Sequence, residues 1–177
     1  MVSTVVPARQ QWSQAAYDRR RADPLEALGD TMNDEERLAA ERACEQLITR
    51  YTHIADFGPG ETMPELFTDD AVWESGEGRY EGREELLGFF GAPRGHAKSR
   101  HVSSNVAVTV TSDDEAEALS YFALYRYSEE KPRVPDLDDQ PVILGEYRDQ
   151  FRRTADGWRI ANRRADVGFV RRSALKG

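Results

Sequence analysis

Cysteine and histidine are scarce in this sequence of 177 residues. The single cysteine, Cys44, excludes a disulfide within the chain and a cysteine-based zinc site, and its helical context favours a small buried apolar residue. Three histidines, His53, His96 and His101, lie far apart, and neither HxH nor HExxH occurs. The sequence also contains no GxGxxG or GxxxxGK run for a nucleotide. We therefore expect no metal ion and no organic cofactor.

Long apolar runs and excess positive charge are also lacking. No run approaches the roughly 20 apolar residues of a membrane-spanning helix. Residues 1–11 lack the charged start and long apolar centre of a secretory signal, so we expect a cytoplasmic protein. The 24 Lys and Arg are outnumbered by 32 Asp and Glu, which gives a net charge of -8. This balance argues against binding to nucleic acid, whose phosphates require clustered cations.

The chain divides near residue 33. Residues 1–32 contain a candidate short helix at 10–22, but too few large apolar groups to bury a core alone. This arm is either disordered or docked on the main body or on a second subunit, with Trp12 as the anchor. Residues 33–172 then form one domain, and residues 173–177 form a tail.

The first strong helix signal is Asn33 followed three positions later by Glu36, a capping box. The helix is expected to end at residues 57–60, where Gly58 would adopt left-handed geometry and a proline follows. Asp56 then lies in the last turn. Apolar residues recur at helical steps before it, at Ala40, Ala43, Cys44, Leu47, Tyr51 and Ile54.

Strands dominate the remainder of the sequence. A second capping pattern, Thr62 to Glu65, predicts a shorter helix that runs through Phe67. Helices that precede an antiparallel meander predict an α+β domain with the helices on one face of the sheet. The expected strands are 71–75, 79–80, 102–111, 115–127, 142–153 and 158–170, with a helix at 83–90.

Several sequence fragments occur in a characteristic order: Tyr51-x-x-x-x-Asp56, the run LFTDDAVW from Leu66, YEGREEL from Tyr80, Arg100-His101-x-x-x-Asn105, Gly145-x-Tyr147 and DGWRI from Asp156. Taken together, they resemble the SnoaL-like branch of the nuclear transport factor two superfamily. The resemblance covers about residues 34–170. It implies a cone: a curved mixed or antiparallel sheet wrapped around N-terminal helices, with an apolar pocket at the open end. The family includes scytalone dehydratase, polyketide cyclases, dehydrochlorinases and members without catalysis, and the resemblance favours a homodimer or higher homo-oligomer through the exposed sheet face.

The resemblance also implies site residues. In the dehydratase-like and dehydrochlorinase-like pattern, an Asp at the end of the first helix orients a His on a central strand, and Asp56 and His101 occupy these positions. Arg163 matches a basic residue on the last strand that would stabilise a leaving anion or an oxyanion. A lysine of the dehydrochlorinase pattern is Tyr51 here, which weakens the case for chloride elimination and offers a neutral hydroxyl donor instead.

Strand alternation predicts that His101 shares a polar side with Ser103, while Val102 and Val106 face the other way. Ideal helical phase places Asp56 about 140° from Tyr51, off the apolar stripe.

The loop at 129–141 is either a lid or a tolerated insertion. We expect aromatic pocket walls formed by Trp73, Tyr121, Tyr125 and Phe169.

The leading hypothesis is a cofactor-independent lyase or isomerase that acts on a small hydrophobic metabolite, with His101 as general base and Asp56 as its partner. Neither nucleic acid nor a membrane is expected as a partner. The first alternative is a non-catalytic binding or assembly module of the same fold. The second is water addition to an epoxide, which requires Arg163 and Asp166 to face the pocket in place of His101.

Overall fold

The computed structural model describes residues 32–93, 98–127 and 141–171, which belong to one compact unit of the chain, residues 31–177. The predicted arm, apart from Met32, lies outside the described residues. His96, nearly all of the 129–141 loop and the 173–177 tail also lie outside them. Within the described ranges, no helix is long and apolar enough to cross a membrane.

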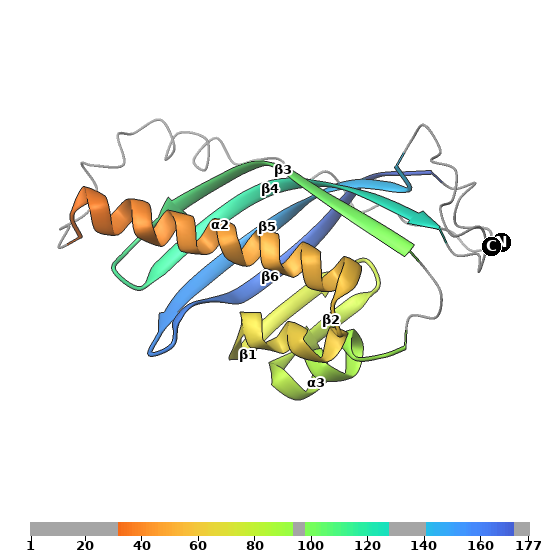
Figure 1. Ribbon diagram of the computed structural model, residues 1–177, viewed down its shortest axis with the longest axis horizontal. Coiled ribbons are helices and arrows are strands. Elements are labelled where there is room, and N and C mark those ends of the chain that lie inside the picture. Colours follow the sequence, from red (N-terminus) through yellow and green to blue (C-terminus); the bar gives the residue numbers. More distant parts are fainter. Residues whose placement is uncertain (1–31, 94–97, 128–140, 172–177) are drawn as a thin grey trace. The chain divides into compact units, whose positions relative to one another are not determined.

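A long helix lies across one face of a curved sheet, and a smaller helical group lies at one end of it (Figure 1). The long helix, α2, packs mainly against β3, whereas α3 packs against β1 and η2. In chain order the elements are α2 (Asp34–Phe57), the 3-10 helix η2 (Gly60–Leu66), β1 (Phe67–Ser75), β2 (Gly78–Glu81), α3 (Gly82–Phe90), β3 (Lys98–Val110), β4 (Glu115–Tyr127), β5 (Ile143–Thr154) and β6 (Gly157–Val170).

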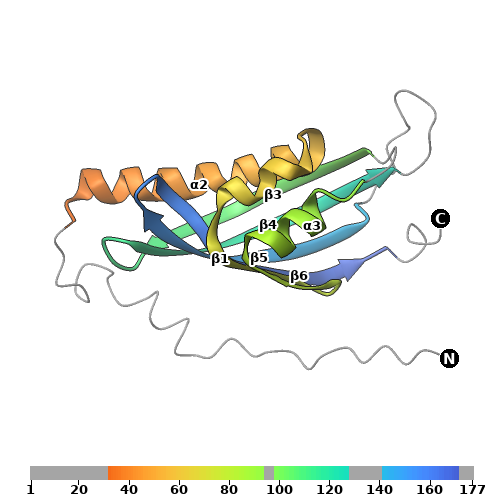
Figure 2. The same ribbon diagram turned by 90° about the horizontal axis from the view of Figure 1, so that it is seen from below.

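The described strands form one open, six-stranded sheet in the order β2-β1-β6-β5-β4-β3. β3 to β6 form the predicted antiparallel meander, whereas β1 pairs with β6 in parallel. Seen from below in Figure 2, α2 lies along one side of the curved sheet. The predicted α+β class, with a curved mixed sheet around helices, is therefore confirmed.

The first helix begins as predicted and ends differently. At its start, the Asn33 side chain accepts from the Glu36 backbone at 3.0 Å, and the Glu36 side chain accepts from the Asn33 backbone at 3.0 Å. At its end, Gly58 has φ -86° and is extended, so the expected left-handed cap was wrong. The predicted second capping box also does not form, because Thr62 lies inside η2 and donates to the Pro59 carbonyl.

A bulge in β3 reverses the side on which its residues point. Asn105 has φ 50°, and the pairing of β3 with β4 shifts by one residue between Ser104 and Ala107. One extra residue changes the phase of the alternation. His101 therefore shares the inner face with Val106, which corrects the expectation from the sequence that the two residues face opposite sides.

Two side chains form an ion pair inside the apolar core. The Arg163 Nε and Nη2 atoms donate to the two Asp149 carboxylate oxygens, each at 2.7 Å, and both side chains are fully buried. Burial acts to lower the pKa of Arg163, but the carboxylate of Asp149 holds it above its ordinary value. The rings of Tyr51 and Tyr147 flank the Arg163 guanidinium. The buried apolar core includes Cys44, Leu47, Ile48, Met63, Leu66, Phe67, Phe90, Phe151 and Ile160.

The bulge leads to a prediction for Asn105. Asn105→Val should lower the free energy of unfolding by about 1–2 kcal/mol, because a β-branched residue is strained at positive φ. Asn105→Gly should stay within about 1 kcal/mol of the parent. Urea unfolding measures both, with Ser104→Val as the matched control in the same strand. Equal effects of Asn105→Val and Ser104→Val would contradict the prediction.

The ion pair leads to a second prediction. Asp149→Ala should destabilise the fold by about 3–5 kcal/mol, because it leaves a buried guanidinium without its counter-charge. The double variant Asp149→Leu/Arg163→Met should lose much less stability than the sum of the losses caused by Asp149→Leu and Arg163→Met singly. A double-mutant cycle in urea measures the coupling, and additive losses would show that the pair is not coupled.

Candidate functional site

The position of Asp56 follows from the face that α2 turns toward β3. Ile48 and Thr52 are buried at four-residue spacing, and Asp56 continues this row by one more turn. The expectation that Asp56 lies off the packed side of the helix was therefore wrong. The stripe that includes Tyr51 is only one of two neighbouring rows that pack against the sheet.

Asp56 and His101 are in direct contact. The His101 Nδ1 atom lies 2.7 Å from Asp56 Oδ1, and the His101 backbone N–H donates to Asp56 Oδ2 at 2.7 Å. Ser99 adds a third contact, donating its hydroxyl to Asp56 Oδ1 at 2.8 Å. The side chains of His101 and Asp56 are only 12% and 4% exposed, so the pair is a sheltered acid–base unit rather than a surface contact.

The surroundings of Asp56 stabilise its ionised form. Burial is the largest single effect and raises the pKa, but hydrogen bonds from the His101 backbone, the His101 ring and Ser99 together lower it below its ordinary value. Asp56 is thus an anion beside the imidazole. With an acceptor at Nδ1, a neutral His101 ring carries its proton on Nδ1, which leaves Nε2 as the basic nitrogen.

The wall beside the pair comes from residues that the sequence analysis did not select. Strand pairing sets Leu124, Ile143 and Val170 in one inner row with His101. The next inner row pairs Ser103 with Phe122. The strands thus supply an aliphatic surface at the pair. Its signal in the sequence was the alternation in β4, where the buried residues are Ala116, Ala118, Ser120, Phe122 and Leu124.

Three of the selected residues lie together deeper in the core. Tyr51 accepts a hydrogen bond from Trp73 Nε1 at 3.0 Å, and the Arg163 guanidinium lies 4.1 Å from the centre of the Tyr51 ring. Tyr51 precedes Asp56 by five residues, about 7.5 Å along the helix axis. Arg163 is engaged by Asp149, and only its Nη1 atom lacks a hydrogen-bond partner among the described residues.

The other three selected aromatic residues do not line the inner face, which corrects the expected pocket walls. Tyr121 and Tyr125 alternate with the buried residues of β4 and lie on the opposite, outer face. Phe169 is 74% exposed and pairs with Leu144 on that outer face. Glu115 and Glu117 share the phase of Tyr121 along β4, and these charges mark the solvent side.

The arrangement required for epoxide opening is also not present. Asp166 lies on the outer face, where it pairs with Arg164 at 2.8 Å and with Arg148 at 3.4 Å. Arg163 points inward and binds Asp149 instead. The two residues therefore do not face a common pocket, and His101 is not displaced from the inner face.

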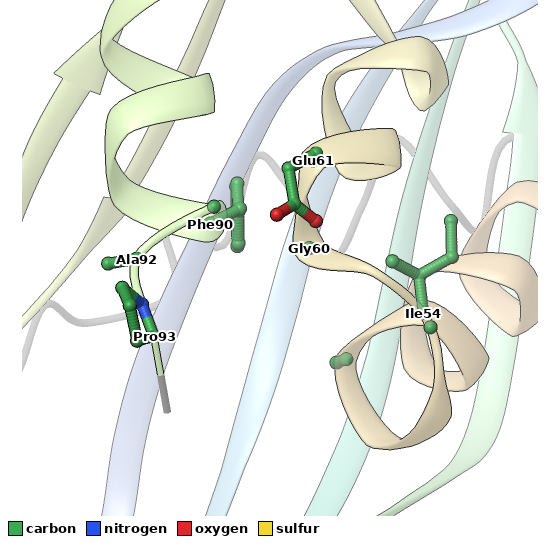
Figure 3. A pocket seen from close by; sticks show the side chains of 9 residues that line it. Ile54, Gly60, Glu61, Phe90, Ala92 and Pro93 are labelled. Carbon is green, nitrogen blue, oxygen red and sulfur yellow. The ribbon is translucent and has the colours of Figure 1, made fainter. Parts of the chain in front are cut away.

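One pocket among the described residues lies beside the last turn of α2, and neither Asp56 nor His101 lines it (Figure 3). Its volume is about 220 Å³, and Glu61 is the only carboxylate that lines it. Among the residues that the structure describes, no group of three or more His, Cys, Asp or Glu side chains is arranged to hold a metal ion. The pocket is lined by Ile54, Ala55, Gly58, Gly60, Glu61, Phe90, Gly91, Ala92 and Pro93.

Similar structures share this architecture at low sequence identity. A scytalone dehydratase-like protein from Novosphingobium aromaticivorans is 20% identical with a TM-score of 0.67, over 78% of this chain and 91% of that chain. The hexachlorocyclohexane dehydrochlorinase LinA-type3 from Novosphingobium barchaimii is 20% identical with a TM-score of 0.62, over 78% and 93%. A Nostoc punctiforme protein of unknown function with a cystatin-like fold is 26% identical with a TM-score of 0.59, over 72% and 90%.

Comparison of the sequence with curated proteins gives no significant match. A family model described as a SnoaL-like domain matches residues 36–164, well over half of the chain. The match extends from the first helix into β6 and includes both Asp56 and His101. The chain therefore belongs to the SnoaL-like domain family.

Proposed function

We propose that the protein is a cofactor-independent lyase or isomerase in which His101 removes a proton from a carbon atom of a small hydrophobic metabolite. The observation that carries the proposal is the 2.7 Å contact between His101 Nδ1 and Asp56 Oδ1 at a sheltered position on the inner face. An imidazole held by a carboxylate is a general base suited to neutral pH. The aliphatic row beside it favours an apolar substrate.

In the proposed reaction, each partner has one task. Asp56 holds the proton of the neutral ring on Nδ1 and balances the charge of the imidazolium that forms. Nε2 accepts the substrate proton, and the electron pair of the broken C–H bond forms a double bond. In a lyase this expels a leaving group, whereas in an isomerase the imidazolium returns the proton to another carbon.

The deeper residues support this step less directly than expected from the sequence. Arg163 is already neutralised by Asp149, so it is a poor counter-charge for a departing anion. Tyr51 lies five residues before Asp56 on α2, and its side chain contacts Trp73 and Arg163. We propose Tyr51 as the donor to a substrate oxygen and Arg163 as a residue that positions Tyr51.

The structural relatives agree with this reaction class. Two of them are named as a dehydratase-like protein and a dehydrochlorinase, and both names denote the elimination of a small leaving group across a carbon–carbon bond. Their identity to this chain is low, so they support the reaction type and leave the substrate open. Tyr51 replaces a lysine of the dehydrochlorinase pattern. This difference favours loss of water over loss of chloride, because a hydroxyl donor assists an oxygen leaving group.

Hydrogen–deuterium exchange tests proton removal before the substrate is known. A panel of small carbonyl- and hydroxyl-bearing hydrophobic compounds, incubated with the protein in D2O, should include members that gain deuterium at an acidic carbon. His101→Gln should abolish this exchange, and Asp56→Asn should slow it by about a hundredfold or more. Mass spectrometry measures the exchange, and thermal-shift titration measures binding by the same variants.

Tyr121→Phe is the matched control, since Tyr121 lies on the outer face and should leave exchange unchanged. Binding should also survive in Asp56→Asn, because the substitution acts on the base and not on the apolar wall. Compounds that bind equally to the parent and to His101→Gln without any exchange would support the non-catalytic binding module instead.

We also propose that the protein self-associates through its outer sheet face. Strand pairing aligns Val102, Ala123, Leu144 and Phe169 in one row across four strands of that face. Val102, Leu144 and Phe169 are all exposed, and Tyr121 flanks the row. A continuous exposed apolar row on a monomer is typical of an interaction surface, and two copies of the same row match each other about a twofold axis.

Phe169→Asp should shift the protein to a smaller assembly, because it places a charge at the most exposed residue of the apolar row. Sedimentation velocity measures the mass, and circular dichroism checks that the fold is retained. Arg152→Asp, on the same face but away from the row, is the control. A parent that sediments as a monomer would refute self-association.

A further inference from the structure

The first residues of β3 contact the end of α2 on two sides. Ser99 and His101 contact Asp56 on the inner side of the strand. Arg100 turns the other way, and its guanidinium lies 4.2 Å from the centre of the Phe57 ring. Ser99 and His101 of the strand therefore hold Asp56 of the helix, and Arg100 between them holds the next helix residue, Phe57.

Within this joint, Ser99 differs from the other donors to Asp56. The backbone N–H of His101 is fixed by the strand, and the His101 ring changes its charge during the proposed reaction. The Ser99 hydroxyl is a neutral donor that stays on Oδ1, the same oxygen that faces Nδ1. It lowers the basicity of that oxygen whether or not the ring is protonated.

This matters at one step of the reaction. After His101 takes a proton at Nε2, the proton on Nδ1 lies between the ring and Asp56 Oδ1. If that oxygen were more basic, the proton would move toward the carboxylate and the charge balance of the imidazolium would be lost. A second hydrogen bond to Oδ1 opposes this transfer.

We propose that Ser99 is a positioning residue, which acts through Asp56 to keep the carboxylate ionised and the Nδ1 proton on the His101 ring. Its catalytic consequence rests on the proposed function of the Asp56–His101 pair. Its effect on Asp56 itself depends only on the observed contacts.

The test compares Ser99→Ala, Ser99→Thr and Arg100→Ala in the full chain. The 13C carboxyl resonance of Asp56 is titrated with pH, and 15N shifts of His101 give the ring tautomer. Ser99→Ala should raise the pKa of Asp56, because it removes a hydrogen bond to the charged form. Ser99→Thr keeps a hydroxyl and should restore the parent titration.

Arg100→Ala is the matched control, because it removes the contact with the Phe57 ring and so weakens the attachment of β3 to α2 on the side away from the carboxylate. It should reduce the thermal midpoint while leaving the titration of Asp56 unchanged. In the exchange assay, Ser99→Ala should lose roughly three- to tenfold in rate, as expected for one hydrogen bond, with unchanged binding.

Two outcomes overturn the inference. The first is an identical titration of Asp56 in Ser99→Ala and in the parent, and the second is a rise of the Asp56 pKa in Arg100→Ala equal to that in Ser99→Ala. The second outcome would mean that Asp56 responds to general loosening of the joint. A changed titration restored by threonine, but without exchange of any compound, supports the role of Ser99 and counts against the lyase or isomerase proposal alone.

Discussion

The carboxylate of Asp56 is the constraint on which the site depends. It joins the last turn of α2 to the first residues of β3 by accepting three hydrogen bonds, two of them from His101. Burial of a carboxylate is costly, and here it is the largest single influence on the Asp56 pKa. The net pKa is nevertheless lowered, so the hydrogen bonds together outweigh burial. The contacts that hold the helix to the strand therefore also keep the group ionised.

A second constraint decides which side chains share a face with this pair. Without the bulge at Asn105, Val106, Val108 and Val110 would point outward, on the face opposite His101. β6 also changes register against β5, between the pairs of Gln150 and Phe151, so that both Ile160 and Arg163 point inward. The inner face thus combines a polar pair at one end of β3 with an apolar core at the other. Unbroken alternation along β3 or β6 would turn part of this polar pair or of the apolar core to the outer face.

The sequence predicted the elements well, because capping boxes, apolar spacing and turn residues are local signals. The Asp56–His101 pairing was expected only through the family resemblance, since no local pattern connects residues 45 positions apart. The orientation of Tyr121, Tyr125 and Phe169 was missed because aromatic residues suit either side of a strand. The neighbouring Glu115 and Glu117 carried the better signal. The extended Gly58 was missed because a glycine permits left-handed geometry without requiring it.

The two ionic systems of the fold differ in what they can do. Arg163 and Asp149 satisfy each other bidentately and are fully sealed, so changing the charge of either would leave its partner buried and unbalanced. Asp56 and His101 are also close-packed, yet the ring retains some exposure, and a proton gained there is balanced by a carboxylate already ionised. The reaction proposed for His101 requires a group that gains and loses a proton, and both properties favour that role. The structure provides them at His101, while the deeper pair supports the core and orients Tyr51.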